Sequence, residues 1–151
     1  MQIHSCHKDA WQLFKNYHYL NGYLTGTSQN YLAKVDGRPC AFLGVINFPH
    51  PKVKNIRKTH RLVVLPEFQG LGIGRILTDE IASHYLKQGF RYRETTSHPA
   101  RIMSHKKNPN WICVESGRMH ARGSTSGIGV GGDSRKRLIT TWEFTGGKKD
   151  G

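Results

Sequence analysis

The sequence contains little cysteine, little acid and no long apolar run. Its three cysteines, Cys6, Cys40 and Cys113, are odd in number and form no Cys-x-x-Cys pair, which argues for reduced thiols and against a disulfide framework. No stretch approaches the ~20 apolar residues of a membrane span, and the N-terminal residues lack the apolar core of a signal peptide. We therefore expect a soluble, cytoplasmic protein.

Acidic residues are outnumbered by basic ones. The sequence has 10 Asp and Glu against 23 Lys and Arg, and its net charge is +13. This excess is larger than solubility requires, and it suggests a polyanionic partner such as nucleic acid. A generally basic, soluble surface is the alternative.

The residue groups typical of metal and hydrolytic sites are also missing. Nine histidines are present, but the densest group, His4, Cys6 and His7, lies in an extended segment whose neighbouring side chains diverge. We therefore expect no metal site. The glutamates in the second half of the chain are isolated from one another, so no carboxylate pair suggests a hydrolase.

One stretch organises the rest of the chain. The run from Leu62 to Gly74 predicts an apolar strand, a glycine-rich turn and the first turn of a helix. This helix ends at Gln88-Gly89 and buries Ile76, Leu77, Ile81 and Tyr85. A loop of small residues at a helix N-terminus leaves backbone N–H groups unpaired, with the positive end of the helix dipole behind them. Such a loop binds anions.

Spacing separates the interpretations of this loop. A nucleotide-binding P-loop needs a Gly-Lys-Ser/Thr ending, which is absent. A dinucleotide fingerprint needs its third glycine three residues after the second, whereas Gly74 follows Gly72 by two. An ordinary tight connection between strand and helix is a further alternative. The run Gln69-Gly70-Leu71-Gly72-Ile73-Gly74 resembles the Gln/Arg-x-x-Gly-x-Gly/Ala loop of the GCN5-related N-acetyltransferase (GNAT) superfamily at every defined position.

The GNAT resemblance implies an α/β fold with a central mixed β-sheet flanked by helices, and an acyl-CoA-dependent N-acyltransferase. It implies that an N–H near the end of the central strand, at Val64 or Leu65, holds the thioester carbonyl group. It also implies which backbone amides hold the pyrophosphate of acetyl-CoA or another acyl-CoA, namely those of Gln69, Gly70, Leu71, Gly72, Ile73 and Gly74.

The remaining pattern fits a single domain over residues 1–145 with a disordered tail over 146–151. Asp36-Gly37 predicts a hairpin between strands over 31–35 and 40–46. Residues 91–97 are expected to form a strand parallel to the central one. Further predictions are a strand over 1–5, a helix from Asp9 with Ala10, Leu13, Phe14, Tyr17 and Leu20 on one face, a loop over 48–58, a helix over 100–107 with Ile102 and Met103 inward, and strands over 111–114 and 138–144.

The candidate general base is a histidine. GNAT members often place a glutamate on the strand before the loop, whereas here Lys58, His60 and Arg61 occupy that region. His60 shares strand parity with Val64, so its ring is a candidate base at the reacting amine. A structural histidine at the start of a strand is the alternative.

The candidate acid lies at the end of the parallel strand. The family often uses a tyrosine to protonate the leaving thiolate, and no tyrosine follows Arg93. Ser97 and His98 are the substitutes that we predict. Their alternative role is a capping serine followed by a histidine held extended by Pro99.

The candidate acceptor-binding residues are basic or aromatic. The loop over 48–58 carries four basic residues and no acid, and it could meet a phosphate backbone. The glycine-rich residues 123–134 form either a flap ordered by substrate or a slack surface hairpin. The acceptor candidates are His18, Tyr19, His50, Lys52, Lys54, Arg57 and Arg101.

We expect the acceptor to be carried by nucleic acid, DNA more than tRNA. The charge, the basic loop and Thr95-Thr96-Ser97-His98-Pro99 resemble the phage-type Mom DNA-modification enzymes, which implies a DNA base that leaves the stack to react. One alternative is an N-acetyltransferase of a protein lysine, a small amine or an aminoacyl-tRNA. Another is an inactive GNAT-fold module that binds nucleic acid.

Overall fold

The computed structural model describes residues 1–18, 22–120 and 136–147. The predicted flap over 123–134 and most of the predicted disordered tail lie outside these residues. The chain divides into two compact units, Met1–Glu94 and Thr95–Gly151, and the prediction of a single domain stays a prediction. Within the described part, no helix is long and apolar enough to cross a membrane.

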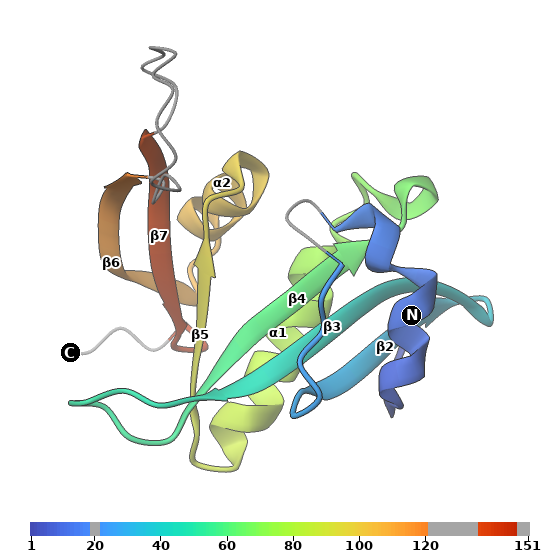
Figure 1. Cartoon of the computed structure of the whole chain (residues 1–151), viewed down its shortest axis with the longest axis horizontal. Coiled ribbons are helices and arrows are strands. Elements are labelled where there is room, and N and C mark those ends of the chain that lie inside the picture. The colour runs from blue at the N-terminus through green and yellow to red at the C-terminus, as the bar shows by residue number, and fades with distance from the viewer. Residues whose placement is uncertain (19–21, 121–135, 148–151) are drawn as a thin grey trace, which may run out of the picture. The chain divides into compact units, whose positions relative to one another are not determined.

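The sheet of the first unit is antiparallel up to its last pair. Strands β1 (Gln2–Cys6), β2 (Gln29–Val35), β3 (Arg38–Phe48) and β4 (Ile56–Val64) lie side by side in chain order (Figure 1). The first residues of β5 (Arg91–Thr96) then pair with β4 in parallel. The hairpin prediction is confirmed, because Asp36 and Gly37 both have positive φ, 50° and 75°, as a type I′ turn requires.

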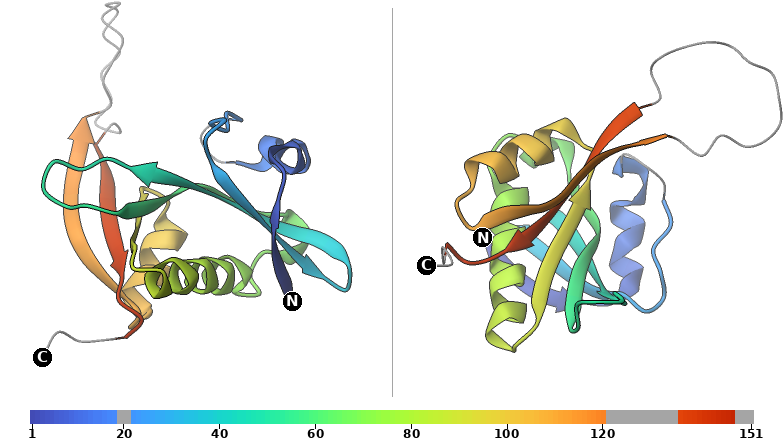
Figure 2. Two further views of the ribbon diagram at one scale, coloured as in Figure 1. Left: turned by 90° about the horizontal axis from the view of Figure 1, so that it is seen from below. Right: turned by 90° about the vertical axis from the view of Figure 1, so that its left-hand side faces the viewer.

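Helices cover both faces of this sheet. Helix α1 (Ile73–Lys87) meets one face, where the Tyr85 hydroxyl lies 2.6 Å from that of Tyr31 on β2. The next residue of β2, Leu32, packs with Trp11 of the N-terminal helices. Since neighbouring strand residues point to opposite faces, α1 and the N-terminal helices lie on opposite sides of the sheet (Figure 2).

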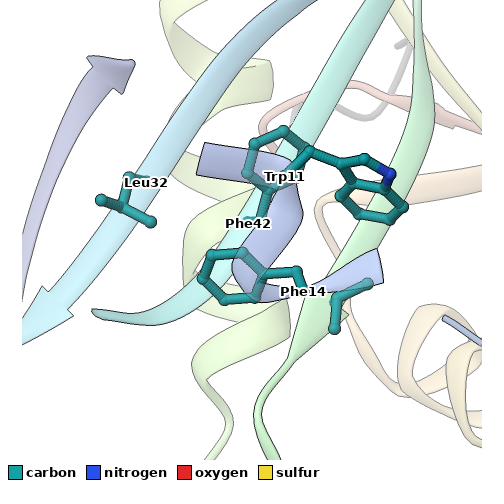
Figure 3. Packing of buried hydrophobic residues seen from close by; sticks show 5 residues of the cluster. Trp11, Phe14, Leu32 and Phe42 are labelled. Atoms are coloured by element: carbon teal, nitrogen blue, oxygen red, sulfur yellow. The ribbon is translucent and has the colours of Figure 1, made fainter. Parts of the chain in front are cut away.

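The N-terminal helix prediction is wrong in type and in part of its buried face: Phe14 is buried as predicted, Leu13 and Tyr17 are not, and Leu20 lies outside the described residues. The segment forms two 3₁₀ helices, η1 (Lys8–Leu13) and η2 (Lys15–Tyr17), and His7 caps the first. Trp11 and Phe14 are buried against Phe42 (Figure 3), whereas Leu13 and Tyr17 are exposed. A repeat of three residues per turn aligns Trp11 with Phe14, whereas in an α-helix Phe14 would share its face with Leu13 and Tyr17.

Two further predictions, the buried face of α1 and the length of the loop over 48–58, are only partly met. Helix α1 buries Leu77, Ile81 and Tyr85 as predicted, but Ile76 is 42% exposed. The predicted loop over 48–58 is shorter, because β3 continues to Phe48 and β4 begins at Ile56. Basic residues are accommodated in this strand because Lys58 Nζ lies 4.1 Å from the ring centroid of Phe48 and Arg57 Cζ lies 4.0 Å from that of Phe90.

The second unit contains the end of β5, α2 (Pro99–Lys107), β6 (Trp111–His120) and β7 (Lys136–Phe144). Strand β7 lies between β5 and β6 and is antiparallel to β6. Helix α2 buries Ile102 as predicted, but it buries His105 between Trp111 and Trp142 in place of Met103, which is exposed. The predicted fold class, a mixed sheet with flanking helices, is confirmed.

Candidate functional site

The glycine-rich loop has an open backbone at the start of α1. After η3 (Pro66–Phe68), Gly70 and Gly72 adopt φ of 82° and 76°, and Gly72 is the helix N-cap without any side-chain cap. The N–H of Ile76 donates to Gly72 at 3.0 Å, so the preceding amides of Ile73, Gly74 and Arg75 have no partner within the helix. A Cβ at Gly70 or Gly72 would meet nothing within 4 Å. The loop therefore combines room for a ligand at Gly70 and Gly72 with the positive end of the α1 helix dipole.

Gln69 supports the loop and does not present an open amide. Its backbone N–H donates to the carbonyl oxygen of Pro66 at 3.3 Å, and its side-chain Nε2 donates to that of Val64 at 3.0 Å. The predicted six-residue cradle therefore narrows to residues 70–74. The Gln69 side chain instead ties the start of the loop to the end of β4.

Strand β4 has one edge that β5 pairs only in part. The parallel pairing covers Ile56–Lys58, whereas β4 continues to Val64. The N–H of Leu65 donates to the carbonyl oxygen of Cys40 at 2.9 Å. Since alternate residues of an antiparallel ladder turn their backbone groups to the same partner, Leu62 and Val64 turn their N–H groups away from β3. Of the two predicted thioester donors, Val64 fits and Leu65 does not.

His60 occupies a β-bulge. Gly44 pairs with Arg61 and Val45 with Thr59, which leaves His60 as the extra residue of β4. The parity argument that aligned His60 with Val64 is therefore wrong, because a bulge interrupts the alternation of side chains. The His60 Nε2 accepts a hydrogen bond from the N–H of Thr25 at 3.1 Å.

The environment of His60 keeps its imidazole neutral. Burial, and then the charges of Arg61 and His18, lower the pKa of His60 to about 4. Its Nε2 lone pair is already engaged with Thr25, so the ring proton lies on Nδ1. These observations favour a role as hydrogen-bond acceptor, while the role as general base stays a prediction.

The candidate acid residues lie between β5 and α2 in the second unit. His98 is the N-cap of α2, because its Nδ1 accepts from the N–H of Ala100 at 3.2 Å. The N–H of His98 itself donates to the Thr96 hydroxyl at 3.1 Å. The cap that was predicted as the alternative role of Ser97 thus belongs to His98.

The predicted acceptor-binding residues are spread over several elements. His18 lies 6.0 Å from the Trp11 ring, centroid to centroid, and Tyr19 is outside the described residues. The His50 Nδ1 accepts from the N–H groups of Lys52 and Val53, both at 3.1 Å, within the loop after β3. The others lie in that loop (Lys54), on β4 (Arg57, which donates to Asn47 at 2.9 Å) and on α2 (Arg101).

Comparison with known proteins identifies the family. Residues 2–106 match the model of the Acetyltransferase (GNAT) family. The chain belongs to the GNAT acetyltransferase family. The family match is general and does not select the narrower Mom-like branch. No curated protein sequence matches the chain.

Solved GNAT structures share the fold. The ribosomal-protein-S18-alanine N-acetyltransferase of Escherichia coli is 14% identical, with a TM-score of 0.68 over 95% of this chain and 92% of that chain. An IAA acetyltransferase from Bacillus cereus is 13% identical, with a TM-score of 0.70 over 95% and 97%. An acetyltransferase of Bacillus subtilis, solved in complex with CoA, is 12% identical, with a TM-score of 0.67 over 95% and 97%. Such identities show a common fold and leave the acceptor open.

Sequence reasoning missed two features of this GNAT site. The N–H of Leu62 turns to the same side as that of Val64, which only the ladder register reveals. Arg75 is exposed in the first turn of α1, where no acid is present and where the helix dipole disfavours a cation. A basic residue at a position of unfavourable potential was the available signal for an anion site.

In the described residues, no three His, Cys, Asp or Glu side chains gather as a metal site would need.

Proposed function

We propose that this chain transfers the acetyl group of acetyl-CoA to an amine carried by nucleic acid. The observation that carries the cofactor half is the bare loop over residues 70–74, with positive φ at Gly70 and Gly72 and no atom within 4 Å of a Cβ at either position. Amides at a helix N-terminus bind phosphate oxygens. The CoA complex of the Bacillus subtilis relative is consistent with this assignment.

The residues of this chain would act mainly by position. Acetyl-CoA supplies the acetyl group as a thioester. The N–H of Val64 would donate to the thioester oxygen and stabilise the negative charge that develops there. The Gln69 side chain occupies the Val64 carbonyl oxygen, so that residue presents a donor and no competing acceptor. Holding the amine beside the thioester carbon supplies much of the rate, and a side-chain base is not obligatory.

The charge of the chain supports a polyanionic acceptor. Lys58 of β4 and Arg93 of β5 are register partners at the last residue of the parallel pairing. Two cations at neighbouring register positions add to the positive potential of this part of the sheet, which attracts an anionic partner. With the net charge of +13, this arrangement favours an exocyclic amine of a DNA base, or second an amine on tRNA, over a polyamine, which the surface would repel.

A panel of acceptors tests the proposal. The protein is incubated with acetyl-CoA and, separately, with a single-stranded DNA oligonucleotide, tRNA, lysine and N-terminal alanine peptides, and spermidine, while free thiol and product mass are followed. We expect acetylated oligonucleotide or tRNA. Acetylated peptide or spermidine alone would overturn the nucleic-acid half, and tight DNA binding without acetyl-CoA binding would indicate the inactive binding module.

Arg75→Ala is expected to weaken acetyl-CoA binding about tenfold, because a cation beside a pyrophosphate makes charge-assisted hydrogen bonds. The same change should slightly raise thermal stability, since it removes a positive charge from the positive end of α1. Isothermal titration and thermal melts measure both effects. Lys87→Ala removes an exposed cation at the other end of α1 and should leave the affinity unchanged; equal losses in both variants would point to net charge alone.

Ser97→Ala and His98→Asn test the predicted acid. We expect either change to lower kcat about tenfold or more, with the Kd for acetyl-CoA unchanged, if the thiolate takes its proton here. In His98→Asn the new amide oxygen can still accept from the N–H of Ala100, so a loss at an unchanged Tm reports proton transfer and not capping. A kcat within about threefold of wild type in both variants would remove the acid assignment.

A further inference from the structure

The segment from Gly22 to Thr25 has no regular secondary structure, yet its backbone is fastened by side chains from elsewhere. The Trp11 Nε1 donates to the carbonyl oxygen of Gly22 at 2.8 Å, and the Arg61 Nε donates to that of Tyr23 at 2.8 Å. The N–H of Thr25 donates to the His60 Nε2 at 3.1 Å. These three hydrogen bonds hold two carbonyl groups and one N–H group of a short loop in place.

Two of these fasteners are neighbours in sequence, which an ordinary strand does not permit. Successive residues of a regular strand point to opposite faces, so His60 and Arg61 could not both reach one segment. The bulge removes that restriction, because it adds His60 between the register partners of Gly44 and Val45. The β-bulge therefore allows His60 and Arg61 to hydrogen-bond to the same segment, and we call this pair a two-residue clamp.

Arg61 also stabilises the bulge itself. Besides its bond to Tyr23, its guanidinium donates from Nη1 to the carbonyl oxygen of His60 at 2.9 Å. The extra residue of a bulge lies outside the ladder, and this bond supplies its carbonyl group with a partner. One side chain therefore holds the bulge and the segment together.

Side-chain packing also holds the segment in place, because Leu24 lies close to Gly44 of β3. A Cβ on Gly44 would lie 3.2 Å from Leu24 Cδ1 and 3.3 Å from Asn30 Oδ1. Leu24 packs against the cluster of Trp11, Phe14 and Phe42. Tyr23, between these anchored residues, stays 66% exposed, so its ring is presented outward from a fixed backbone.

We propose that His60 and Arg61 are positioning residues that clamp Gly22–Thr25 as a fixed wall beside the unpaired part of β4, with Tyr23 as the residue that contacts the acceptor. This rests on the proposed function, because it assigns the wall to the acceptor side of that site. His60 then acts as a neutral hydrogen-bond acceptor and need not take a proton from the amine. Arg61 and His18 are the charged or titratable neighbours that disfavour its protonation.

Paired variants separate a clamp from a base. In His60→Gln the side-chain oxygen can accept from Thr25 but cannot act as a base at neutral pH, whereas His60→Ala removes both abilities. Hydrogen exchange of the Thr25 amide can be measured at pH 7 without any acetyl-acceptor substrate. We expect about tenfold faster exchange in His60→Ala, as for one lost hydrogen bond, and near-wild-type exchange in His60→Gln. His84→Ala, a change of an exposed histidine on α1, is the control and should leave Thr25 exchange unaltered.

Steady-state kinetics give a second test of the clamp, with whichever acceptor of the panel the wild-type protein acetylates as the substrate. We expect His60→Ala and Tyr23→Ala to raise the acceptor KM about tenfold with kcat within about threefold, and His60→Gln to restore the KM. A kcat about 100-fold lower in both His60 variants would overturn the clamp and establish His60 as the base. Unchanged Thr25 exchange in His60→Ala would also overturn it. If no panel member is acetylated, the proposed function fails while the exchange result still decides the clamp.

Discussion

Gly72→Glu raises the Kd for acetyl-CoA at least about 100-fold, because it places a carboxylate where the pyrophosphate is expected to lie. Gly72 has a φ of 76° and open space at its Cβ position, so the new side chain would occupy the ligand's place without colliding with the protein. Gly72→Ala, which brings backbone strain of about 1 kcal/mol without charge, should weaken binding far less. Isothermal titration with acetyl-CoA measures the difference.

Gly89→Glu is the matched control for this result. Gly89 follows the other end of α1, has a φ of 89° and likewise has nothing within 4 Å of a Cβ. The substitution therefore adds the same charge and similar strain away from the loop. An affinity loss of equal size in both variants would trace the effect to a destabilised helix, and an unchanged affinity in Gly72→Glu would remove the pyrophosphate assignment.

Replacing the Val64 amide by an ester lowers kcat about 100-fold to 1,000-fold, which is the effect of removing one donor from an oxyanion site. The α-hydroxy acid analogue of valine keeps the side chain and replaces the N–H by an oxygen, and it also weakens the Val63 carbonyl group as an acceptor. That N–H faces away from β3, so stability should change little. Single-turnover measurement of thiol release reports the chemical step directly.

The ester at Leu65 is the control, and we expect it to lower stability but not kcat. The Leu65 N–H donates to Cys40 at 2.9 Å, so its loss should cost about 1 kcal/mol of stability and leave kcat nearly unchanged. The ester at Leu62 tests the second outward amide of β4. If the Val64 ester retains full kcat and the Leu62 ester does not, the donor is Leu62.

The sequence by itself determined the elements whose signals are local. Asp36-Gly37 required positive φ at both positions, and the glycines at 70 and 72 required a left-handed turn before α1. These are properties of a few adjacent residues, so the hairpin, the loop and the helix that follows were predictable. The GNAT family and its mixed sheet followed from the same loop.

The N-terminal helix and the short loop after β3 were not predictable in this way. Whether Trp11 or Leu13 is buried depends on which residue meets Phe42, a residue about 30 positions away along the chain. Similarly, Arg57 and Lys58 enter a strand because aromatic rings lie beneath their cations. Local polarity suggested a loop, and tertiary contacts outweighed it.

Only the tertiary structure decided how the candidate site is built. The orientation of the Val64 and Leu65 amides depends on the register of β4 with β3, and the direction of His60 depends on one extra residue in that register. Sequence alternation cannot reveal a bulge, because the extra residue is defined only by the strand opposite. The backbone of the predicted anion-binding loop is therefore a property of its own residues, whereas the assignment of His60 and of the thioester donor depends on how two strands pair.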